Sequence, residues 1–318
     1  MALPDGASKI IALEAAKAPG PQLARAAREL SEAYRGQRTP ANQLIATTAH
    51  RAAYLTVRLP ATYAAIEHSL RRLRECAPDF APHTLLDLGA GPGTATLAAY
   101  ETFPSLLSAT LIERDRAMVE IGRKLLALRN IRLLTQDLNS ASFLPADLVM
   151  CAYTLNELSE NQVHAVLTRA MTAATQCLLI LEPGSPAGFA NVLAARKMLI
   201  DAPDFAIGAP CPGEMACPLA EAGDWCHFAA RVQRTSQHRR LKSATLSYED
   251  EKFCYVIGVR QPLSTYPETT RILRRPEKLK GHVKLQLCTI DGLQSAVITK
   301  KNGEDYKRAR NTEWGDGW

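Results

Sequence analysis

The stretch that decides the fold is Leu85-Leu86-Asp87-Leu88-Gly89-Ala90-Gly91-Pro92-Gly93-Thr94, an apolar run that leads into three closely spaced glycines. The apolar run predicts a buried strand, and the glycines allow a sharp turn and a close ligand approach at the start of a helix. The Gly-Lys-Ser/Thr ending of a phosphate-binding P-loop is missing, and the third glycine comes one position too early for the dinucleotide motif G-x-G-x-x-G. Both of those nucleotide sites are therefore disfavoured.

The spacing resembles instead the first motif of class I S-adenosylmethionine (SAM)-dependent methyltransferases. Glu113 closes the next predicted strand, where a carboxylate can accept the ribose hydroxyl protons of a nucleoside. Asp137 follows the third predicted strand, and an acidic residue there resembles the one that contacts the adenine amino group in this family. We predict a SAM site made by residues at the ends of the strands: Asp87, Gly89, Gly91, Gly93, Glu113 and Asp137.

The surrounding pattern predicts a doubly wound α/β fold with a mostly parallel sheet. Short apolar runs alternate with amphipathic segments, as in a parallel sheet with crossover helices. The runs are 84–88, 109–113, 131–135, 148–151 and 177–182. Residues 7–75 are rich in Ala, Leu and Arg, are interrupted by Pro21, Pro40 and Pro60, and predict helices.

The rest of the chain is expected to add a cysteine-rich segment and further strands. We expect an irregular segment at 202–219, a helix through 225–234, and strands at 253–259, 282–288 and 295–299, the last two forming a hairpin across Asp291-Gly292. The predicted organisation is a helical N-terminal region (1–80), a methyltransferase domain (81–260) with a metal-binding insertion at about 202–230, and a basic β-rich C-terminal extension (261–318).

Composition and charge narrow the class of protein. The chain has 318 residues, 47% hydrophobic and 22% charged, as expected for a soluble globular protein, and no apolar run approaches the roughly 20 residues of a membrane span. Its first thirty residues contain Asp5 and Glu14 and lack an apolar segment of the secretory type. We therefore expect a cytoplasmic protein, with a monomer as the default state.

The net charge of +6 is unevenly distributed, because residues 81–226 carry −6 and residues 227–318 carry +8. A basic flank is often only a solvated surface, but clustered Lys and Arg also bind nucleic acid by displacing phosphate counterions. We predict RNA contact by the tail. Its basic residues are Arg271, Arg274, Arg275, Lys278, Lys280, Lys284, Lys300, Lys301, Lys307, Arg308 and Arg310.

The segment after the fourth predicted strand, Tyr153-Thr154-Leu155-Asn156-Glu157, occupies the place where class I methyltransferases put substrate-facing groups. It holds neither the Asp/Asn-Pro-Pro-aromatic motif of amino-group methyltransferases nor a Pro-Cys nucleophile. Asn156 and Glu157 are the candidate catalytic residues, although either could orient a substrate or simply cap the next helix.

Four cysteines lie close together in the sequence: Cys211, Cys217, Cys226 and Cys254. Prolines beside the first two favour a non-helical backbone, which lets sulfurs converge. Four thiolates suit zinc or an iron-sulfur cluster, and His227 could replace Cys254 as a zinc ligand. Cys76, Cys177 and Cys288 are interpreted as unpaired buried cysteines.

The motifs together resemble one family, the methyltransferase-like assembly factors of the small ribosomal subunit, which has mitochondrial and bacterial members. They are Leu-Asp-Leu-Gly-Ala-Gly-Pro-Gly-Thr, Leu-Asn-Glu-Leu, Glu-Pro-Gly, Cys-Pro-x4-Cys-Pro-Leu, Asp-Trp-Cys-His-Phe and Tyr-Glu-Asp-Glu-Lys-Phe. The resemblance runs from about residue 40 to the terminal Trp-Gly-Asp-Gly-Trp, and the cysteine segments are its most specific part.

This resemblance implies a class I methyltransferase fold that binds rRNA of the small subunit during ribosome biogenesis. It also implies a 4Fe-4S cluster on four cysteines, of which Cys211, Cys217 and Cys226 match the family segment directly and Cys254 is the fourth candidate. We expect a bacterial cytoplasmic member that acts by methylation or as a non-catalytic RNA-binding assembly factor. The alternative is a small-molecule methyltransferase with a structural zinc.

Overall fold

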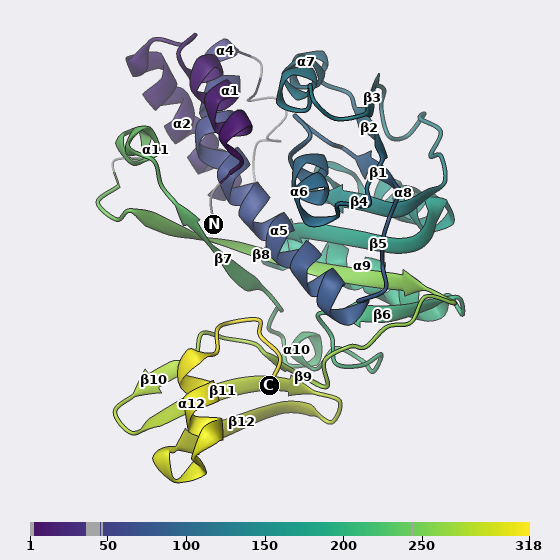
Figure 1. Cartoon of the computed structure of the whole chain (residues 1–318), viewed down its shortest axis with the longest axis vertical. Coiled ribbons are helices and arrows are strands. Elements are labelled where there is room, and N and C mark those ends of the chain that lie inside the picture. The colour runs from purple at the N-terminus through teal and green to yellow at the C-terminus, as the bar shows by residue number, and fades with distance from the viewer. Residues whose placement is uncertain (1–2, 36–44, 46, 243) are drawn as a thin grey trace.

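The central sheet is mostly parallel, with strand order β3-β2-β1-β4-β5-β8-β6 and with β7 paired to β8 (Figure 1). The computed structural model describes residues 3–35, 45, 47–242 and 244–318. Strands β1 to β5 pair in parallel, whereas β8 runs antiparallel to β5, β6 and β7. The strands are β1 (Thr84–Leu88), β2 (Ser108–Glu113), β3 (Ile131–Thr135), β4 (Ala146–Ala152), β5 (Ala174–Pro183), β6 (Phe205–Ala209), β7 (Phe228–Gln233) and β8 (Tyr248–Arg260). The predicted class I methyltransferase fold is confirmed.

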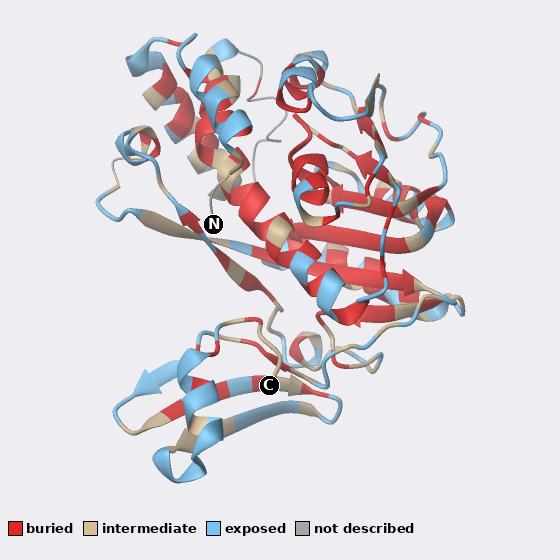
Figure 2. Cartoon of the chain, viewed as in Figure 1, coloured by how far each residue is buried: buried red, intermediate tan, exposed pale blue. Residues whose placement is uncertain are grey.

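Helices cover both faces of this sheet, because successive strand residues point to opposite sides. Along β1, Leu85 belongs to the core under one set of helices and Leu86 to the core under the other. The helices after β1 and β2 pack on the first face, and the two that flank β5 pack on the second. They are α6 (Thr94–Thr102), α7 (Arg116–Leu125), α8 (Glu160–Ala173) and α9 (Pro186–Asp201). Figure 2 shows the strands between them as almost entirely buried.

The N-terminal region is helical, as its composition predicts, and packs on the same face as α6. Pro60 does not interrupt it, because Pro60 lies in the first turn of its helix, where a missing N–H costs no hydrogen bond. Pro40 lies outside the described residues. The elements are α1 (Asp5–Ala15), α2 (Gly20–Arg35), α4 (Thr48–Ala53), the π-helix η1 (Tyr54–Arg58) and α5 (Leu59–Cys76).

Two expectations about the cysteine-rich part were wrong. The helix expected at 225–234 is strand β7, in which Phe228, Ala230 and Val232 are buried while Arg231 and Gln233 are exposed. That period of two matches its antiparallel pairing with β8. The segment 202–219, expected to be irregular, contains strand β6 and the short helix α10 (Pro218–Glu221).

The C-terminal part forms a second, antiparallel sheet that lies below the main sheet in Figure 1. Its hairpin joins β11 to β12 with Thr289 opposite Gly292, so the predicted turn is present. One side of this sheet packs on the last helix around Ala309. Its elements are β9 (Thr270–Ile272), β10 (Glu277–Leu279), β11 (His282–Thr289), β12 (Gly292–Thr299), η3 (Lys300–Asn302) and α12 (Glu304–Asn311). The short helix α11 (Ser236–Leu241) is not part of this sheet and lies between β7 and β8 in the sequence.

Every helix in the described part of the chain is too short or too polar to cross a membrane. The predicted domain boundaries stay a prediction.

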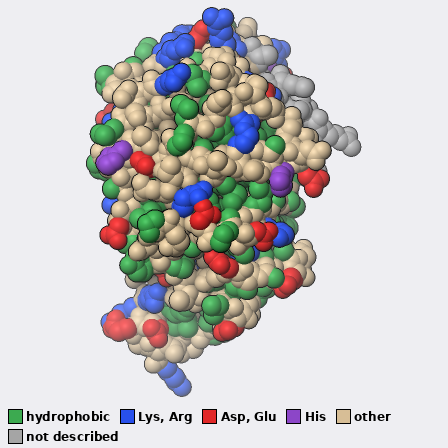
Figure 3. Space-filling model, turned by 90° about the vertical axis from the view of Figure 1, so that its right-hand side faces the viewer, with side chains coloured by type: hydrophobic (Ala, Val, Ile, Leu, Met, Phe, Trp, Pro, Cys, Tyr) green, Lys and Arg blue, Asp and Glu red, His purple; other side chains and the backbone are tan. Residues whose placement is uncertain are grey.

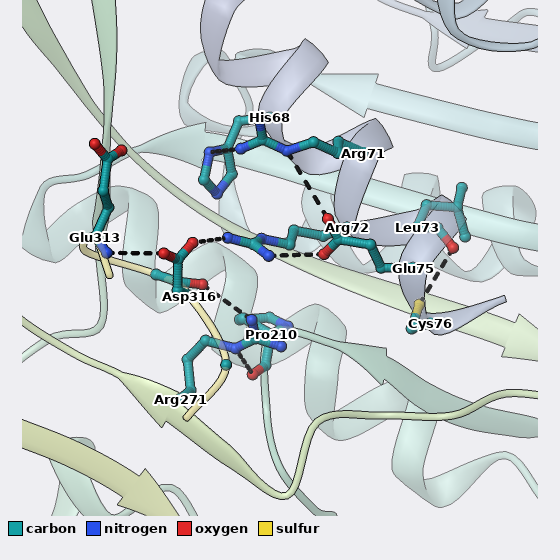
Figure 4. A network of polar contacts seen from close by, with 12 residues as sticks. His68, Arg71, Arg72, Leu73, Glu75, Cys76, Pro210, Arg271, Glu313 and Asp316 are labelled. Carbon is teal, nitrogen blue, oxygen red and sulfur yellow. Dashed lines mark hydrogen bonds and ion pairs between the residues drawn. The ribbon is translucent and has the colours of Figure 1, made fainter. Parts of the chain in front are cut away.

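A polar network joins the C-terminal residues to α5 (Figure 4). Arg72 of α5 forms an ion pair with Asp316, and Arg271 of β9 donates to the carbonyl oxygens of Pro210 (3.0 Å) and Gly315 (2.9 Å). Arg72 and Arg271 are both buried. The end of the chain therefore fixes the second sheet against the methyltransferase core.

His68 of α5 lies within this network and meets Phe253 edge to face, with 5.3 Å between ring centroids. Its Nε2 has no hydrogen-bond partner among the described residues. Burial, and then the positive charges of Arg72 and Arg71, lower the pKa of His68 to about 3. The folded protein thus keeps this imidazole neutral.

We expect the protein to lose stability as the pH falls from about 6.5 toward 3, because the unfolded chain then binds a proton that folded His68 does not accept. The loss attributable to His68 is at most about 1.4 kcal/mol per pH unit. In urea titrations at pH 7, 6 and 5, the difference in unfolding free energy between wild type and His68→Gln should therefore shrink as the pH falls. A constant difference would mean that His68 binds protons equally in the folded and unfolded states, so that folding does not lower its pKa.

Candidate functional site

The glycine-rich turn between β1 and α6 forms the floor of the first candidate site. Gly89, Gly91 and Gly93 have φ of 70°, 54° and 82°, in the left-handed region that favours glycine. The amide N–H groups of Gly89 and Ala90 donate to the carbonyl oxygen of Ile112 at 2.9 and 3.1 Å, which ties the turn to β2. A Cβ on Gly89 would overlap the side chain of Thr154, so this position also needs glycine for space.

Two carboxylates, the buried Asp87 and the half-buried Glu113, hold this turn. Asp87 accepts hydrogen bonds from the amide (3.1 Å) and the hydroxyl (2.7 Å) of Thr96, and burial raises its pKa to about 6. Glu113 accepts the amide N–H of Gly91 (2.8 Å) on one oxygen and that of Asp115 (2.7 Å) on the other. Burial raises the pKa of Glu113 as well. Each carboxylate therefore fixes the backbone and also faces the cavity.

The cavity lies where the strand order reverses between β1 and β4, the usual ligand position in such sheets. Its wall includes the predicted residues Asp87, Gly89, Gly91, Glu113 and Asp137. Gly93 is not in the wall, since its Cα faces Leu126 and Leu111, so its role is in packing the turn.

Residues of the N-terminal helical region also line this cavity, and the sequence did not predict them. Tyr54 and Arg58, from the π-helix η1, and Thr62, from α5, line it. Arg58 forms two hydrogen bonds with Glu251 of β8, at 2.9 and 3.0 Å. The sequence carries no motif for these residues, because they reach the cavity only through the packing of η1 and α5 on the sheet.

Tyr153, directly after β4, is the non-glycine residue with positive φ (58°) among the described residues. Its hydroxyl donates to the Glu251 carboxylate at 3.1 Å, so Glu251 accepts hydrogen bonds from both Tyr153 and Arg58. Burial raises the pKa of Tyr153. A bulky residue held in this region stores backbone strain, which is often found in the wall of a functional site.

The turn after Tyr153 rests on Glu182 at the end of β5. One oxygen of this fully buried carboxylate accepts the amide N–H groups of Thr154 (3.0 Å) and Leu155 (2.8 Å). Its other oxygen has no partner among the described residues, and burial raises its pKa to about 8. Glu182 is not in the cavity lining; it stands behind the wall and positions Thr154.

The two candidate catalytic residues differ in position. Glu157 lines the cavity and pairs with Arg114 at 3.2 Å, and burial raises its pKa. Asn156 is outside the lining and accepts a hydrogen bond from Asn191 at 2.8 Å. Glu157 is therefore better placed than Asn156 to contact a ligand.

A second cavity is lined by the predicted Cys211, Cys217, Cys226 and Cys254, together with Cys288 of β11. Burial raises the pKa of the Cys226 thiol, and the other four sulfurs raise it further. As placed, however, no group of three or more His, Cys, Asp or Glu side chains in the described part of the chain could hold a metal ion. The five thiols share a cavity without forming a single-ion site.

Cys254 and Cys288 have different surroundings in this cavity. The Cys254 thiol is 1% exposed and already donates to the carbonyl oxygen of Pro183 at 3.3 Å. Burial and the nearby sulfurs of Cys211 and Cys217 raise the pKa of Cys288 to about 12. His227 is not in the lining, because its ring stacks on Trp225 and meets Trp314.

Seven of the eleven basic residues of the tail fall into two groups. Arg271 is buried, Arg274 pairs with Asp224 (2.6 Å) and Arg275 pairs with Asp250 (2.7 Å), so these three serve the structure. A further group gathers at one end of the second sheet, where the Lys300 amide N–H donates to Gly281 and Arg310 donates to Leu279. This basic end consists of the exposed Lys280, Lys300, Lys301 and Arg310. Over the middle of the face drawn in Figure 3, Lys and Arg are interspersed with Asp and Glu.

Comparison with known proteins identifies relatives over most of the chain. Residues 48–318 match the family model described as mitochondrial small ribosomal subunit Rsm22. The human ribosome assembly protein METTL17, mitochondrial, is 30% identical over 290 residues, which cover 83% of this chain and 61% of that protein. The mitochondrial Rsm22-cox11 tandem protein 2 of Schizosaccharomyces pombe is 25% identical over 323 residues, covering 83% of this chain and 42% of that one.

Solved structures of methyltransferases are also similar, but weakly. The plantazolicin methyltransferase BpumL has a TM-score of 0.44 at 14% identity, covering 80% of this chain and 98% of that one. The magnesium protoporphyrin IX methyltransferase of Synechocystis has a TM-score of 0.42 at 15% identity, covering 65% and 85%. Likenesses at this level carry no weight for function.

These relatives correct one expectation. A bacterial cytoplasmic location was predicted from the charged N-terminus and the resemblance, but the matched family and both curated relatives are named as mitochondrial proteins. That prediction was wrong. Charges in the first thirty residues argue only against a secretory signal, which says nothing about the organelle.

The fit between Gly89 and Thr154 gives a test of the first site. Gly89→Ala should cost about 1 kcal/mol for positive φ and about 2 kcal/mol more for the overlap, because Thr154 is held by hydrogen bonds to Leu88 and Ala152. Gly223→Ala is the matched control, since Gly223 has the same φ of 70° and nothing within 4 Å of the added Cβ. Urea unfolding should show the larger loss at Gly89, and equal losses would contradict the described contact.

Proposed function

We propose, since the chain belongs to the Rsm22 family, that it binds SAM in the first cavity and acts on the small ribosomal subunit during its assembly. The names of the family and of the human relative support this role. The chain spans about 61% of the length of that relative and 42% of the yeast one, so partners of the whole protein belong to the proposal.

The observation that carries SAM binding is the position of acidic residues beside the glycine turn, in the wall of one cavity. Glu113 and Asp137 both line the cavity, where Glu113 would accept the ribose hydroxyls and Asp137 the adenine amino group. A Cβ added at Gly91 would meet only the Tyr54 hydroxyl, at 3.9 Å, so the wall is open at this glycine. Asp87 and Glu113 add negative charge beside a cationic sulfonium. Bound SAM would supply an electrophilic methyl group; the chain's residues orient it and exclude water.

A binding role fits the wall of the cavity better than acid-base catalysis does. The Tyr153 hydroxyl donates to Glu251 and Glu157 pairs with Arg114, so both side chains already have protein partners. We therefore propose an assembly factor that uses SAM binding. Incorporation of a labelled methyl group into small-subunit rRNA by the purified protein would favour the catalytic alternative.

We predict that Glu113→Ala weakens SAM binding about ten- to a hundredfold, because it removes charge-assisted hydrogen bonds worth roughly 1.5 to 3 kcal/mol. Isothermal titration calorimetry of wild type and variant measures the change. Glu120→Ala, on the exposed side of α7, is the control and should bind as wild type does. Equal affinities in wild type and Glu113→Ala would remove Glu113 from the site.

We also propose a 4Fe-4S cluster in the second cavity. Zinc would need four donors about 2.3 Å from one ion, which the described side chains do not offer as placed. A cluster bonds each thiolate through a different iron, so its ligands line a cavity rather than converge on one point. The shared cavity of five cysteines supports this chemistry, and His227 gives no support to the zinc alternative.

The proposed ligands are Cys211, Cys217 and Cys226 with one further cysteine. Cys254 was the sequence prediction, but its thiol is committed to the Pro183 carbonyl inside the sheet. Cys288 is less buried and is close enough to Cys211 and Cys217 for their charges to raise its pKa. We therefore place Cys288 ahead of Cys254 as the fourth ligand.

Replacing a ligand should remove the cluster and loosen the loops that it closes. In anaerobically purified protein we expect Cys226→Ser and Cys288→Ser to lose most of their iron, sulfide and visible absorption, whereas Cys254→Ser keeps them. Cys177→Ser, in β5 outside the cavity, is the control. Full iron in Cys288→Ser with loss in Cys254→Ser would restore the original assignment, and zinc without iron or sulfide in wild type would reject the cluster.

For the ribosomal partner, we propose that the basic end of the second sheet contacts rRNA phosphates. Its four exposed cations form no ion pair among the described residues. Arg274 and Arg275 are not part of this surface, because their charges are already neutralised by Asp224 and Asp250.

Binding to purified small subunits should weaken steeply with salt, and reversing the charge of all four residues to Glu should lower the log-log slope by roughly 0.7 for each lost phosphate contact. The control reverses four exposed charges on the methyltransferase domain: Arg116, Arg123, Arg132 and Lys197. Filter binding across a salt series measures both. If neither variant changes the slope, the basic end is only a solvated surface. If the wild type does not bind small subunits even at low salt, the ribosomal role is rejected and the alternative of a small-molecule methyltransferase is favoured.

A further inference from the structure

The second cavity contains two arginines besides its cysteines. Arg196 of α9 and Arg271 of β9 both line it, and their side chains are buried, with 7% and 3% of the residue exposed. Neither forms an ion pair with any described carboxylate, although most other buried or half-buried arginines of the chain do. A buried guanidinium without an anion is costly, so these two charges need an explanation.

Arg196 contacts the cysteine segment directly. Its Nε donates to the sulfur of Cys211 at 3.2 Å, and one terminal nitrogen donates to the carbonyl oxygens of Gly213 (2.9 Å) and Met215 (2.8 Å). Arg271 donates to the carbonyl oxygen of Pro210 at 3.0 Å (Figure 4). Residues 210–215 therefore accept hydrogen bonds from two cations.

A thiolate-bound cluster supplies the missing negative charge. Four thiolates outweigh the positive charge of a 4Fe-4S core, so the bound group is an anion overall, and hydrogen bonds to cysteine sulfur favour its more reduced form. A site built only to pack apolar residues would gain nothing from two buried guanidinium groups. The two charges thus suit an anionic occupant of this cavity.

We propose that Arg196 is a positioning residue that balances the charge of the cluster and raises its reduction potential through its hydrogen bond to Cys211. This inference rests on the proposed cluster and extends it. Arg271 contributes charge from further away, since its hydrogen bonds go to backbone carbonyls rather than to sulfur. Arg196 therefore has the larger effect on the potential.

Two substitutions of Arg196 distinguish the effect of its positive charge from its hydrogen bonds to the loop at residues 210–215. Arg196→Lys keeps the positive charge, and Arg196→Gln keeps a donor but loses the charge. The matched control is Arg260→Gln, since Arg260 also donates to two backbone carbonyls, those of Ala174 (2.8 Å) and Met171 (2.7 Å), but lies outside the cavity. The full-length chain is purified anaerobically, its iron and sulfide are measured, and its midpoint potential is determined by redox titration followed by electron paramagnetic resonance.

We expect a more negative midpoint potential in Arg196→Gln, a smaller shift in Arg196→Lys and none in Arg260→Gln. If the variants lose cluster, the iron content should fall in the order wild type, Arg196→Lys, Arg196→Gln. An unchanged potential in a loaded Arg196→Gln, or equal cluster loss in both Arg196 variants, would overturn the inference and leave Arg196 as loop support. Wild type without iron and sulfide would instead reject the cluster itself.

Discussion

The antiparallel pairing of β8 with β5 is the contact on which both candidate sites depend. It sets Cys254 opposite Glu182. The same pair of strands therefore carries Cys254, which lines the second cavity, and Glu182, which stands behind the wall of the first cavity. Glu182 holds the backbone of Thr154 and Leu155, and Thr154 in turn fills the space beside Gly89. Earlier on β8, Glu251 accepts hydrogen bonds from Arg58 and Tyr153, which both line the first cavity. A shift of one residue in this register would disturb both cavities.

The two cavities have opposite electrostatic character, which suits the two proposed occupants. The first is lined by Asp87, Glu113, Asp137 and Glu157 and suits a cationic sulfonium. The second is lined by thiols and two buried arginines and suits an anionic cluster. It also lies where residues of the methyltransferase domain meet Cys288 of the second sheet, so a bound cluster would join the two parts of the chain. Such a joint would fix the basic end of the second sheet relative to the SAM cavity.

The sequence predicted those features that depend on local backbone chemistry. The glycine turn, the five parallel strands and the carboxylates at their ends follow from period, spacing and positive-φ requirements, and the structure brings Asp87, Glu113 and Asp137 to one cavity. Features set by long-range packing were missed. Strand β7 was taken for a helix because its alternation is short, and Cys288 was set aside because only the folding of β11 brings it to the other cysteines. Tyr54 and Arg58 likewise reach the first cavity only through the packing of η1.

The central claim is that the main sheet supports two separate sites, one in each cavity. Hydrogen exchange measured by mass spectrometry tests this claim most directly. Added SAM should slow exchange in the segments that line the first cavity, 87–94, 113–118 and 152–158, and leave 210–226 unchanged. Removal of iron by a chelator should speed exchange in 210–226 and 284–290 and leave 87–94 unchanged. Protection by SAM confined to the second cavity, or no protection in either, would contradict the account.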